Sequence, residues 1–411
     1  MHRLQVRDAV QVKGLFLLFG FAIAAFFPFL ALYLEQHHHL SEAEIGFVLA
    51  AASIARMLVN PVWGHVSDTK LGRLTALRIG LVGCIVFALA LNLVQGLFAV
   101  AAVLTLHAVF MVAQGPNVDA IALTHLGDAR MSEYGRIRGW ESVTYAIGCF
   151  TFGIALQAGG LGWEMPIYAA CLLAILAWSS TITPDRPEPS AGHGRLGAVG
   201  AVFRTAPRLW GFLCAALLVW TGFNAAWNFI AIRIAQQGGG PFLVGLGTGL
   251  GGVVEVFTMR SSSRLQGRFG LRWTYVLGCL IYAGGFLLWG SVSNATALSV
   301  LTMFEGAGFS LLFTTAVVIV GRLLPSSLYS TGNSVSQMVG FGIGPIIGAG
   351  LGGLVYEHMG PAVLYTGASG LAVSGALVAW FALDVPLLRD PLPPGLPAEP
   401  VVGQPEAGPM P

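Results

Sequence analysis

The sequence predicts an all-α integral membrane protein with twelve transmembrane helices, arranged as two six-helix halves that repeat in parallel. Three observations support this fold class. Of the 411 residues, 55% are hydrophobic and only 10% are charged, whereas a soluble domain carries about 25% charged residues. The mean hydropathy is +0.75, and the apolar residues form long runs rather than the short alternating segments of an outer-membrane barrel. The 55 glycines suit helices that pack closely in a bilayer.

Each predicted span is an apolar run bounded by charged residues or by glycine and proline. A span needs about 20 apolar residues, so a chain of 411 residues can hold a dozen spans with their loops. The first run follows basic residues, as a signal peptide would, but it is too long for one and ends without a small-residue cleavage site. We therefore expect it to be an uncleaved span. The predicted spans are 14–34, 45–65, 74–96, 97–124, 138–159, 163–182, 208–232, 240–262, 271–292, 295–323, 328–355 and 361–384.

The distribution of Lys and Arg predicts the orientation. With twelve spans, the loops on one side carry almost all of these residues, and the opposite loops hold only Arg233. Because cytoplasmic loops are enriched in Lys and Arg, we expect both termini on the cytoplasmic side of the cell (inner) membrane. The longest internal break is rich in proline and divides the spans six and six. The predicted organisation is an N-terminal half at 1–183, a cytoplasmic linker at 184–207, a C-terminal half at 208–385 and a disordered cytoplasmic tail at 386–411.

Composition and motifs exclude several kinds of partner. The 21 Lys and Arg nearly balance the 19 Asp and Glu, which argues against a nucleic-acid partner. No G-x-x-x-x-G-K-[ST] loop occurs, so ATP is not the expected energy source. The five cysteines lie singly in apolar runs, and the histidines at 37–39 lack carboxylates at ligand spacing, so neither a metal nor another cofactor is predicted. We expect a small-molecule substrate, the lipid bilayer as surroundings and a proton gradient as the energy source.

Ionisable residues inside the spans are the best guide to function, since each costs ~3 kcal/mol at the bilayer centre. Asp119 and Arg138 lie on adjacent antiparallel spans, where they can pair and then open to receive a polar substrate. The alternative is a purely structural pair. Glu141 follows Arg138 by three residues and can compete for it. The full set is Arg56, Asp119, Arg138, Glu141, Glu255, Arg260 and Glu305.

Glu305 lies in the middle of its span, where the neutral form of a carboxyl group is favoured. That property is required of a proton carrier, although a structural carboxyl bonded to a backbone carbonyl is equally compatible. Glu255 is a second candidate for proton coupling.

The seventh span carries aromatic and amide side chains at helical spacing. Phe223 and Trp227 are four residues apart, as are Asn224 and Asn228, so each pair shares a helix face. Phe223, Asn224 and Trp227 are candidate substrate-binding residues for a ring-bearing solute. Helix packing is the alternative for the aromatic pair, and it is the commoner use of such a face.

The turn from Gly64 to Arg73 resembles the loop signature of the major facilitator superfamily, G-x-x-x-D-R/K-x-G-R-R/K. Asp68, Gly72 and Arg73 match the signature, and one extra residue separates Asp68 from Gly72. The resemblance implies a fold of two parallel six-helix repeats and action as a monomer. It also implies that this turn helps to control the switch between inward- and outward-open states.

The stretch across the fourth and fifth spans resembles the lactose permease and phenylpropionate permease branch of that superfamily. In the lactose permease family, an acidic residue and an Arg matching Asp119 and Arg138 form the substrate clamp. The run Met303-Phe304-Glu305 is similar to the proton site of the family, with Thr302 in place of its His. The Glu-Val pair that begins at Glu255 also recurs in the phenylpropionate permease branch. Further matches are Pro116, Ala120, Tyr134 and Trp140.

The leading prediction is a secondary transporter that imports a small organic solute with protons by alternating access. The substrate would be an aromatic carboxylate such as phenylpropionate, or a sugar or nucleoside. A proton-driven efflux antiporter is the alternative, although the G-x-x-x-G-P-x-x-G pattern of that branch occurs here at 340–348 rather than in the fifth span. A polytopic membrane enzyme would gather its catalytic side chains at one interface, and the scattered charges argue against enzymatic activity.

Overall fold

The computed structural model describes residues 2–126, 133–183 and 196–389, and every regular element within them is helical. The elements before the predicted linker are α1 (His2–Phe26), α2 (Leu30–Gln36), α3 (Glu42–Val66), η1 (Ser67–Leu71), α4 (Arg73–Leu91), α5 (Leu97–Met111), α6 (Gly115–Leu126), α7 (Tyr134–Gly159), η3 (Leu161–Trp163) and α8 (Glu164–Ser179). The remaining elements are α9 (Leu196–Thr205), α10 (Arg208–Gln236), α11 (Pro241–Ser291), α12 (Ala295–Leu301), α13 (Met303–Leu323), α14 (Ser326–Met338), η4 (Val339–Ile343), α15 (Gly344–Met359), α16 (Pro361–Ala382) and α17 (Pro386–Arg389).

The described residues contain 11 helical stretches long and apolar enough to cross a membrane. One of them is α11, whose 51 residues would extend far beyond the bilayer as a straight helix. It is interrupted at Gly270, whose φ of 79° and ψ of 168° are not helical. This glycine separates two spans, which brings the total to the predicted twelve. The expected loop between the eighth and ninth spans is wrong, because helix continues up to this single residue.

Several spans are interrupted midway, and the interruptions have local causes. Pro28 lies between α1 and α2, where its missing N–H and its ring prevent a continuous helix. Pro116 is the second residue of α6, and the break after α5 lies directly before it, since a proline is tolerated only in the first turn of a helix. The tenth span breaks at Thr302, and the eleventh passes through the π-helical turn η4. Transporters use such discontinuous helices around a central site.

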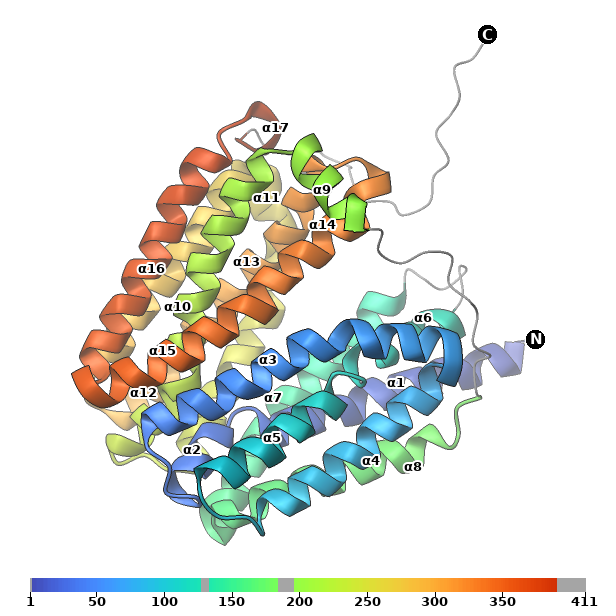
Figure 1. Cartoon of the computed structure of the whole chain (residues 1–411), viewed down its shortest axis with the longest axis vertical. Coiled ribbons are helices and arrows are strands. Elements are labelled where there is room, and N and C mark those ends of the chain that lie inside the picture. The colour runs from blue at the N-terminus through green and yellow to red at the C-terminus, as the bar shows by residue number, and fades with distance from the viewer. Residues whose placement is uncertain (1, 127–132, 184–195, 390–411) are drawn as a thin grey trace.

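The two halves meet at one end of the molecule and diverge toward the other (Figure 1). Across the boundary between them, α3 packs against α15 and α7 packs against α11. Within the halves, α1 packs on α7 and α8, while α10 packs on α15 and α16. A space between the halves is therefore closed at the end that carries α2 and α12.

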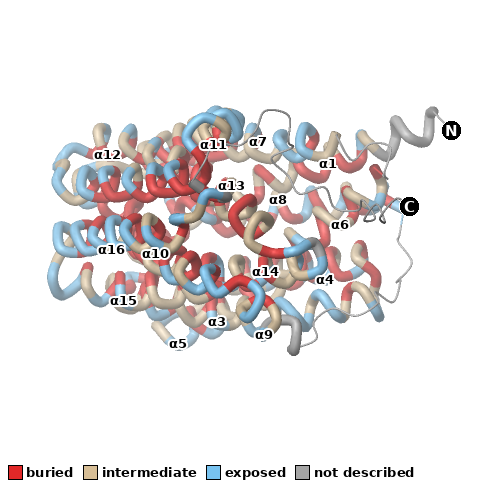
Figure 2. Tube along the Cα trace, turned by 90° about the horizontal axis from the view of Figure 1, so that it is seen from above, coloured by how far each residue is buried: buried red, intermediate tan, exposed pale blue. Residues whose placement is uncertain are grey.

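The outer surface of both halves is apolar. Figure 2 shows exposed segments along the outside of the helices and buried ones between them. Large exposed side chains include Phe98 (81%), Phe257 (65%) and Phe381 (74%). In water such a surface would aggregate, whereas in a bilayer it contacts lipid tails.

The predicted linker and tail are only partly described. Residues 184–195 and 390–411 lie outside the described residues. Most of the tail that was predicted to be disordered falls in the second of these ranges. Two parts of these segments are helical, contrary to a continuous loop: α9 within the linker and the short α17 at the start of the tail.

Candidate functional site

A cavity of about 250 Å³ lies between the two halves. Its walls come from the interrupted spans and from α3, α5, α10 and α11, so both halves contribute. The lining residues of the N-terminal half are Phe26, Phe27, Pro28, Leu30, Ala31, Leu49, Ala52, Ser53, Arg56, Leu104, Ala108 and Met111. Those of the C-terminal half are Asn224, Trp227, Asn228, Ile230, Ala231, Ile234, Val244, Thr248, Thr302, Phe341 and Pro345.

Arg56 is the charged residue among those that line this cavity. Its Nη2 donates to Ser53 Oγ at 2.9 Å, and Ser53 in turn donates to the Leu49 carbonyl oxygen at 2.8 Å. Among the described residues, no ion pair involves Arg56. Sequence reasoning counted Arg56 as an intramembrane charge but did not assign it to the site. Its position three residues after a polar Ser on α3 was the available signal.

The seventh span, α10, places two of the three candidate residues at the cavity. Asn224 and Trp227 line the cavity, together with Asn228. Phe223 lies behind this wall: it is 8% exposed and stacks on Tyr282 with ring centroids 5.3 Å apart. Its place is that of a packing residue, which is the alternative that the helical spacing left open.

Asp119 and Arg138 come together, as their positions on adjacent spans predict. Arg138 Nε lies 3.8 Å from Asp119 Oδ1, with side-chain exposures of 50% and 34%. Tyr134 donates its hydroxyl to the same Asp119 oxygen at 2.8 Å. Neither member of the pair lines the central cavity. In this conformation the pair joins α6 to α7 on the side of the N-terminal half that faces α11.

Three carboxyl groups lie on α7, α11 and α13, and α11 packs against both of the other helices. Glu255 on α11 interacts electrostatically with Glu141 on α7. It also interacts with Glu305 on α13. Arg138 interacts with both Glu141 and Glu255. The described ion pairs include none of the three acids. Glu305 lies so close to α11 that a Cβ on Gly251 would be 3.3 Å from its Oε2.

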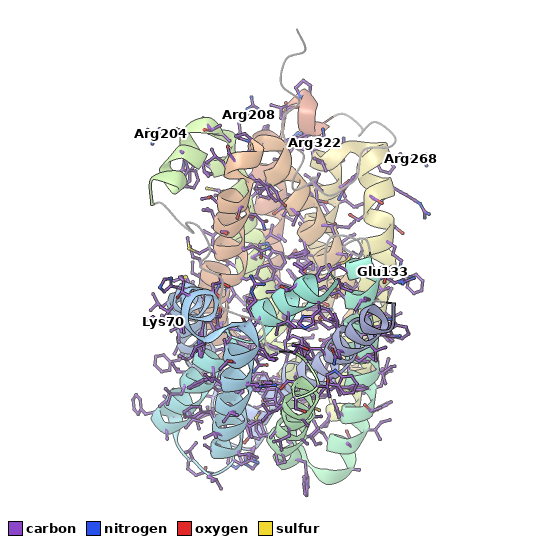
Figure 3. The ribbon with its side chains drawn as sticks, turned by 90° about the vertical axis from the view of Figure 1, so that its right-hand side faces the viewer. Lys70, Glu133, Arg204, Arg208, Arg268 and Arg322 are labelled. Carbon is purple, nitrogen blue, oxygen red and sulfur yellow. The ribbon has the colours of Figure 1, made fainter. Side chains whose placement is uncertain are left out.

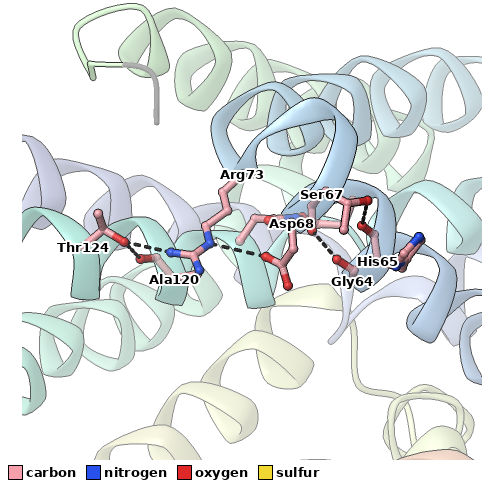
Figure 4. A network of polar contacts seen from close by, with 10 residues as sticks. Gly64, His65, Ser67, Asp68, Arg73, Ala120 and Thr124 are labelled. Carbon is pink, nitrogen blue, oxygen red and sulfur yellow. Dashed lines mark hydrogen bonds and ion pairs between the residues drawn. The ribbon is translucent and has the colours of Figure 1, made fainter. Parts of the chain in front are cut away.

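The loop between the second and third spans forms a compact polar network (Figure 4). Arg73 Nε lies 3.5 Å from Asp68 Oδ1, and Arg73 Nη1 donates to Thr124 Oγ1 on α6 at 2.8 Å. The extra residue between Asp68 and Gly72 is accommodated by the π-helical turn η1, since a π turn takes up one residue more than an α turn. The Asp68–Arg73 contact therefore forms despite the different spacing.

Gly72 ends this turn with φ 77° and ψ 152°, a conformation restricted almost entirely to glycine. We expect Gly72→Ala to strain the turn by about 1–3 kcal/mol and to slow transport several-fold without loss of folded protein. Initial uptake rates measure the effect. Gly135→Ala is the matched control, because its Cβ would meet nothing within 4 Å. Equal rates for the two variants would contradict a role for the turn.

The closed end of the cavity is held by contacts between the halves. The backbone N–H of Ala43 on α3 donates to Glu357 Oε2 on α15 at 2.8 Å. Gln236 on α10 donates to Glu42 Oε1 at 3.2 Å. Immediately below, Gly46 of α3 crosses α15 so closely that a Cβ on it would be 2.5 Å from the Ala349 carbonyl oxygen.

His38, in the short segment between α2 and α3, is buried against Tyr33 and His37. Its side chain is 5% exposed, and neither ring nitrogen has a hydrogen-bond partner among the described residues. Burial, together with the neighbouring His37 and His39, lowers the pKa of His38 to about 4. The imidazole is therefore neutral at physiological pH. In the described residues, no group of three or more His, Cys, Asp or Glu could hold a metal ion.

Comparison with known proteins identifies the family. The profile described as "MFS_1 like family" matches residues 10–366. The chain belongs to this family. Its members include permeases of the major facilitator superfamily, so the protein is a multi-pass membrane transporter and not an enzyme.

Two similar curated proteins are sugar permeases by name. A maltose permease from Geobacillus stearothermophilus is 28% identical over 88% of this chain and 91% of its own length. A lactose permease from Klebsiella oxytoca is 24% identical over 69% of this chain and 72% of its own. Among solved structures, a variant of the nucleoside transporter NupG superimposes with a TM-score of 0.83 at 16% identity, covering 92% of this chain and 100% of that one. That likeness confirms the major facilitator fold.

Proposed function

We propose that this MFS_1 like transporter imports a small organic solute together with protons by alternating access. The observation that carries the proposal is the central cavity, which both halves line and which is closed at one end. Rocking of the halves about α3–α15 and α7–α11 would close the diverging end and open the other. The same cavity would then face alternate sides of the membrane.

The orientation follows from the basic residues. Figure 3 looks onto the end at which the halves diverge, with Lys70, Arg204, Arg208, Arg268 and Arg322 around it. Since Lys and Arg favour the cytoplasmic side, we propose that this end faces the cytoplasm of a cell with the protein in its inner membrane. The structure then represents an inward-open state, and the protein acts as a monomer.

The acidic cluster supports proton coupling. Glu141, Glu255 and Glu305 lie on three helices, one of them in the opposite half, so movement of α7 against α11 changes their surroundings. A carboxyl group loses its charge on protonation, and the neutral form is favoured away from water and cations. We propose that Glu305 carries the proton and that Glu255 accepts or relays it. Asp119, Arg138 and Glu141 would link this cluster to the switch loop through α6.

The substrate is proposed to be a sugar or a nucleoside. Trp227 offers a flat apolar face, and Asn224 and Asn228 offer amides beside it, a combination that suits a hydroxylated ring. The names of the similar permeases and of NupG agree with this class. An aromatic carboxylate is the second candidate, because Arg56 in the cavity has no carboxylate partner among the described residues.

External pH in a weakly buffered cell suspension tests this function. Maltose, a nucleoside and phenylpropionate are added separately to cells that express the protein. Import with protons makes the medium more alkaline for the transported solute. We expect Glu305→Gln to reduce this alkalinisation at least tenfold, because the amide cannot take up a proton.

Glu44→Gln is the matched control, since Glu44 accepts from the backbone N–H of Ser41 at 2.9 Å and glutamine can replace it in this capping box. An unchanged signal in Glu305→Gln would transfer the proton role to Glu255 or Glu141. Acidification on solute addition would indicate the efflux antiporter instead.

A further inference from the structure

The positive charge of Arg56, which lines the cavity, has no ion-pair partner among the described residues. A guanidinium group has five N–H donors, and one hydrogen bond, to Ser53, is formed to another side chain. An arginine inside a membrane is retained only where it has a partner or a function. None of the ion pairs among the described residues brings a carboxylate to Arg56. A ligand with an anionic group would satisfy Arg56 directly, and a carboxylate fits its planar fork best.

The opposite wall offers hydrogen-bond acceptors. Thr248 Oγ1 already donates its proton to the Val244 carbonyl oxygen at 2.9 Å, so its oxygen is left to accept. Asn224 Nδ2 donates to the Trp220 carbonyl oxygen at 2.8 Å. The Asn224 Oδ1 is therefore also available to accept a hydrogen bond. Asn228 lines the cavity beside them. Acceptors of this kind are satisfied by hydroxyl groups on the ligand.

We propose that the central cavity binds a hydroxylated monocarboxylate, that is, a sugar acid. Its carboxylate pairs with Arg56 of the N-terminal half, and its hydroxyl groups donate to Asn224, Asn228 and Thr248 of the C-terminal half. The carbon skeleton lies against Trp227. This inference rests on the proposed function and defines its substrate class more closely. Because the ligand bridges the two halves, binding also draws them together.

Neither a neutral sugar or nucleoside nor an aromatic carboxylate provides partners for the polar groups on both walls of the cavity. A neutral sugar or nucleoside leaves the charge of Arg56 unpaired. An aromatic carboxylate pairs with Arg56 but brings no hydroxyl groups to the acceptors opposite. Sites that hydrogen-bond a ligand group reject analogues that lack it, because buried polar atoms are then left without partners.

Binding to the purified protein, measured by calorimetry without any proton gradient, tests the proposal. The probes are glucuronate, galacturonate and gluconate as sugar acids, glucose and maltose as neutral sugars, and phenylpropionate as an acid without hydroxyl groups. We expect at least one sugar acid to bind ten or more times as tightly as glucose, maltose and phenylpropionate. Arg56→Gln should remove at least tenfold of that affinity, and Arg56→Lys should restore part of it. Asn228→Leu should weaken the sugar acid more than phenylpropionate.

Arg136→Gln is the control for loss of a positive charge, since that side chain is 77% exposed on α7 and pairs with Glu133. It should leave binding unchanged, and thermal unfolding confirms that each variant is folded. Binding of none of the three sugar acids to the folded wild-type protein overturns the proposal. So does tighter binding of maltose that Arg56→Gln does not alter. Sugar-acid binding without solute-linked alkalinisation would instead refute proton coupling and leave this inference standing.

Discussion

Gly46→Leu is expected to stop transport while leaving the protein folded and able to bind its substrate. Gly46 and Gly353 cross where α3 of one half meets α15 of the other. A Cβ at position 46 would lie 3.0 Å from the Gly353 Cα and 2.5 Å from the Ala349 carbonyl oxygen. These are backbone atoms, so α3 and α15 have to separate. Overpacking of this kind costs about 1–3 kcal/mol, which shifts a two-state equilibrium by about 5- to 150-fold.

In the proposed alternating-access cycle this end has to close once in every turnover, so the uptake rate should fall by the same factor. Uptake into cells and binding to purified protein measure the two effects separately. Gly367→Leu on α16 is the matched control, because its Cβ would meet nothing within 4 Å, and it should transport normally. Uptake by Gly46→Leu within threefold of the wild-type rate would show that closure at this crossing is not needed.

Gly306→Ala is expected to destabilise the C-terminal half itself. In the crossing of α11 and α13, a Cβ at position 306 would overlap the Gly251 carbonyl oxygen and lie 3.0 Å from the Glu255 backbone nitrogen. The two helices carry Glu255 and Glu305, so their separation also displaces the acidic cluster. We expect a loss of about 3 kcal/mol in the free energy of unfolding. A lower thermal midpoint and a lower yield of folded protein would record it.

Gly284→Ala provides the comparison within the same helix pair. Gly284 lies on α11, and its Cβ would meet nothing within 4 Å, so alanine should be neutral or slightly stabilising because of its higher helix propensity. If Gly306→Ala and Gly284→Ala had the same thermal midpoint, the tight crossing of α11 and α13 would not contribute to stability.

Sequence alone was sufficient for the fold because a membrane span has a simple signature. The apolar runs predicted where the spans lie. The distribution of Lys and Arg between the loops of the two sides agreed with a total of twelve spans. The exception was the turn at Gly270, where a polar, basic stretch with two glycines reads as a loop. Helix geometry continues through its charged residues because they lie at the end of the bundle, where water is available to them.

The site was harder to predict, because lining a cavity depends on helix rotation and on which spans become neighbours. Asp119 and Arg138 could be paired from their places on adjacent spans, but their distance from the cavity could not be foreseen. Arg56 was visible only as one more intramembrane charge, since nothing local distinguishes a cation that faces a cavity from one that faces another helix. The two aromatic residues of the seventh span have different surroundings: Trp227 lines the cavity, and Phe223 stacks on Tyr282 behind it.

Arg56, which has no ion-pair partner among the described residues, also bears on the driving force. A neutral solute that enters with one proton carries a net positive charge, so its accumulation draws on the membrane potential, worth about 2.3 kcal/mol per elementary charge for each 100 mV. A monocarboxylate that pairs with Arg56 and enters with one proton carries no net charge. Its uptake is electroneutral and depends on the pH difference alone. If the proposed substrate class and proton coupling hold, Arg56 thereby determines whether uptake draws on the membrane potential or on the pH difference.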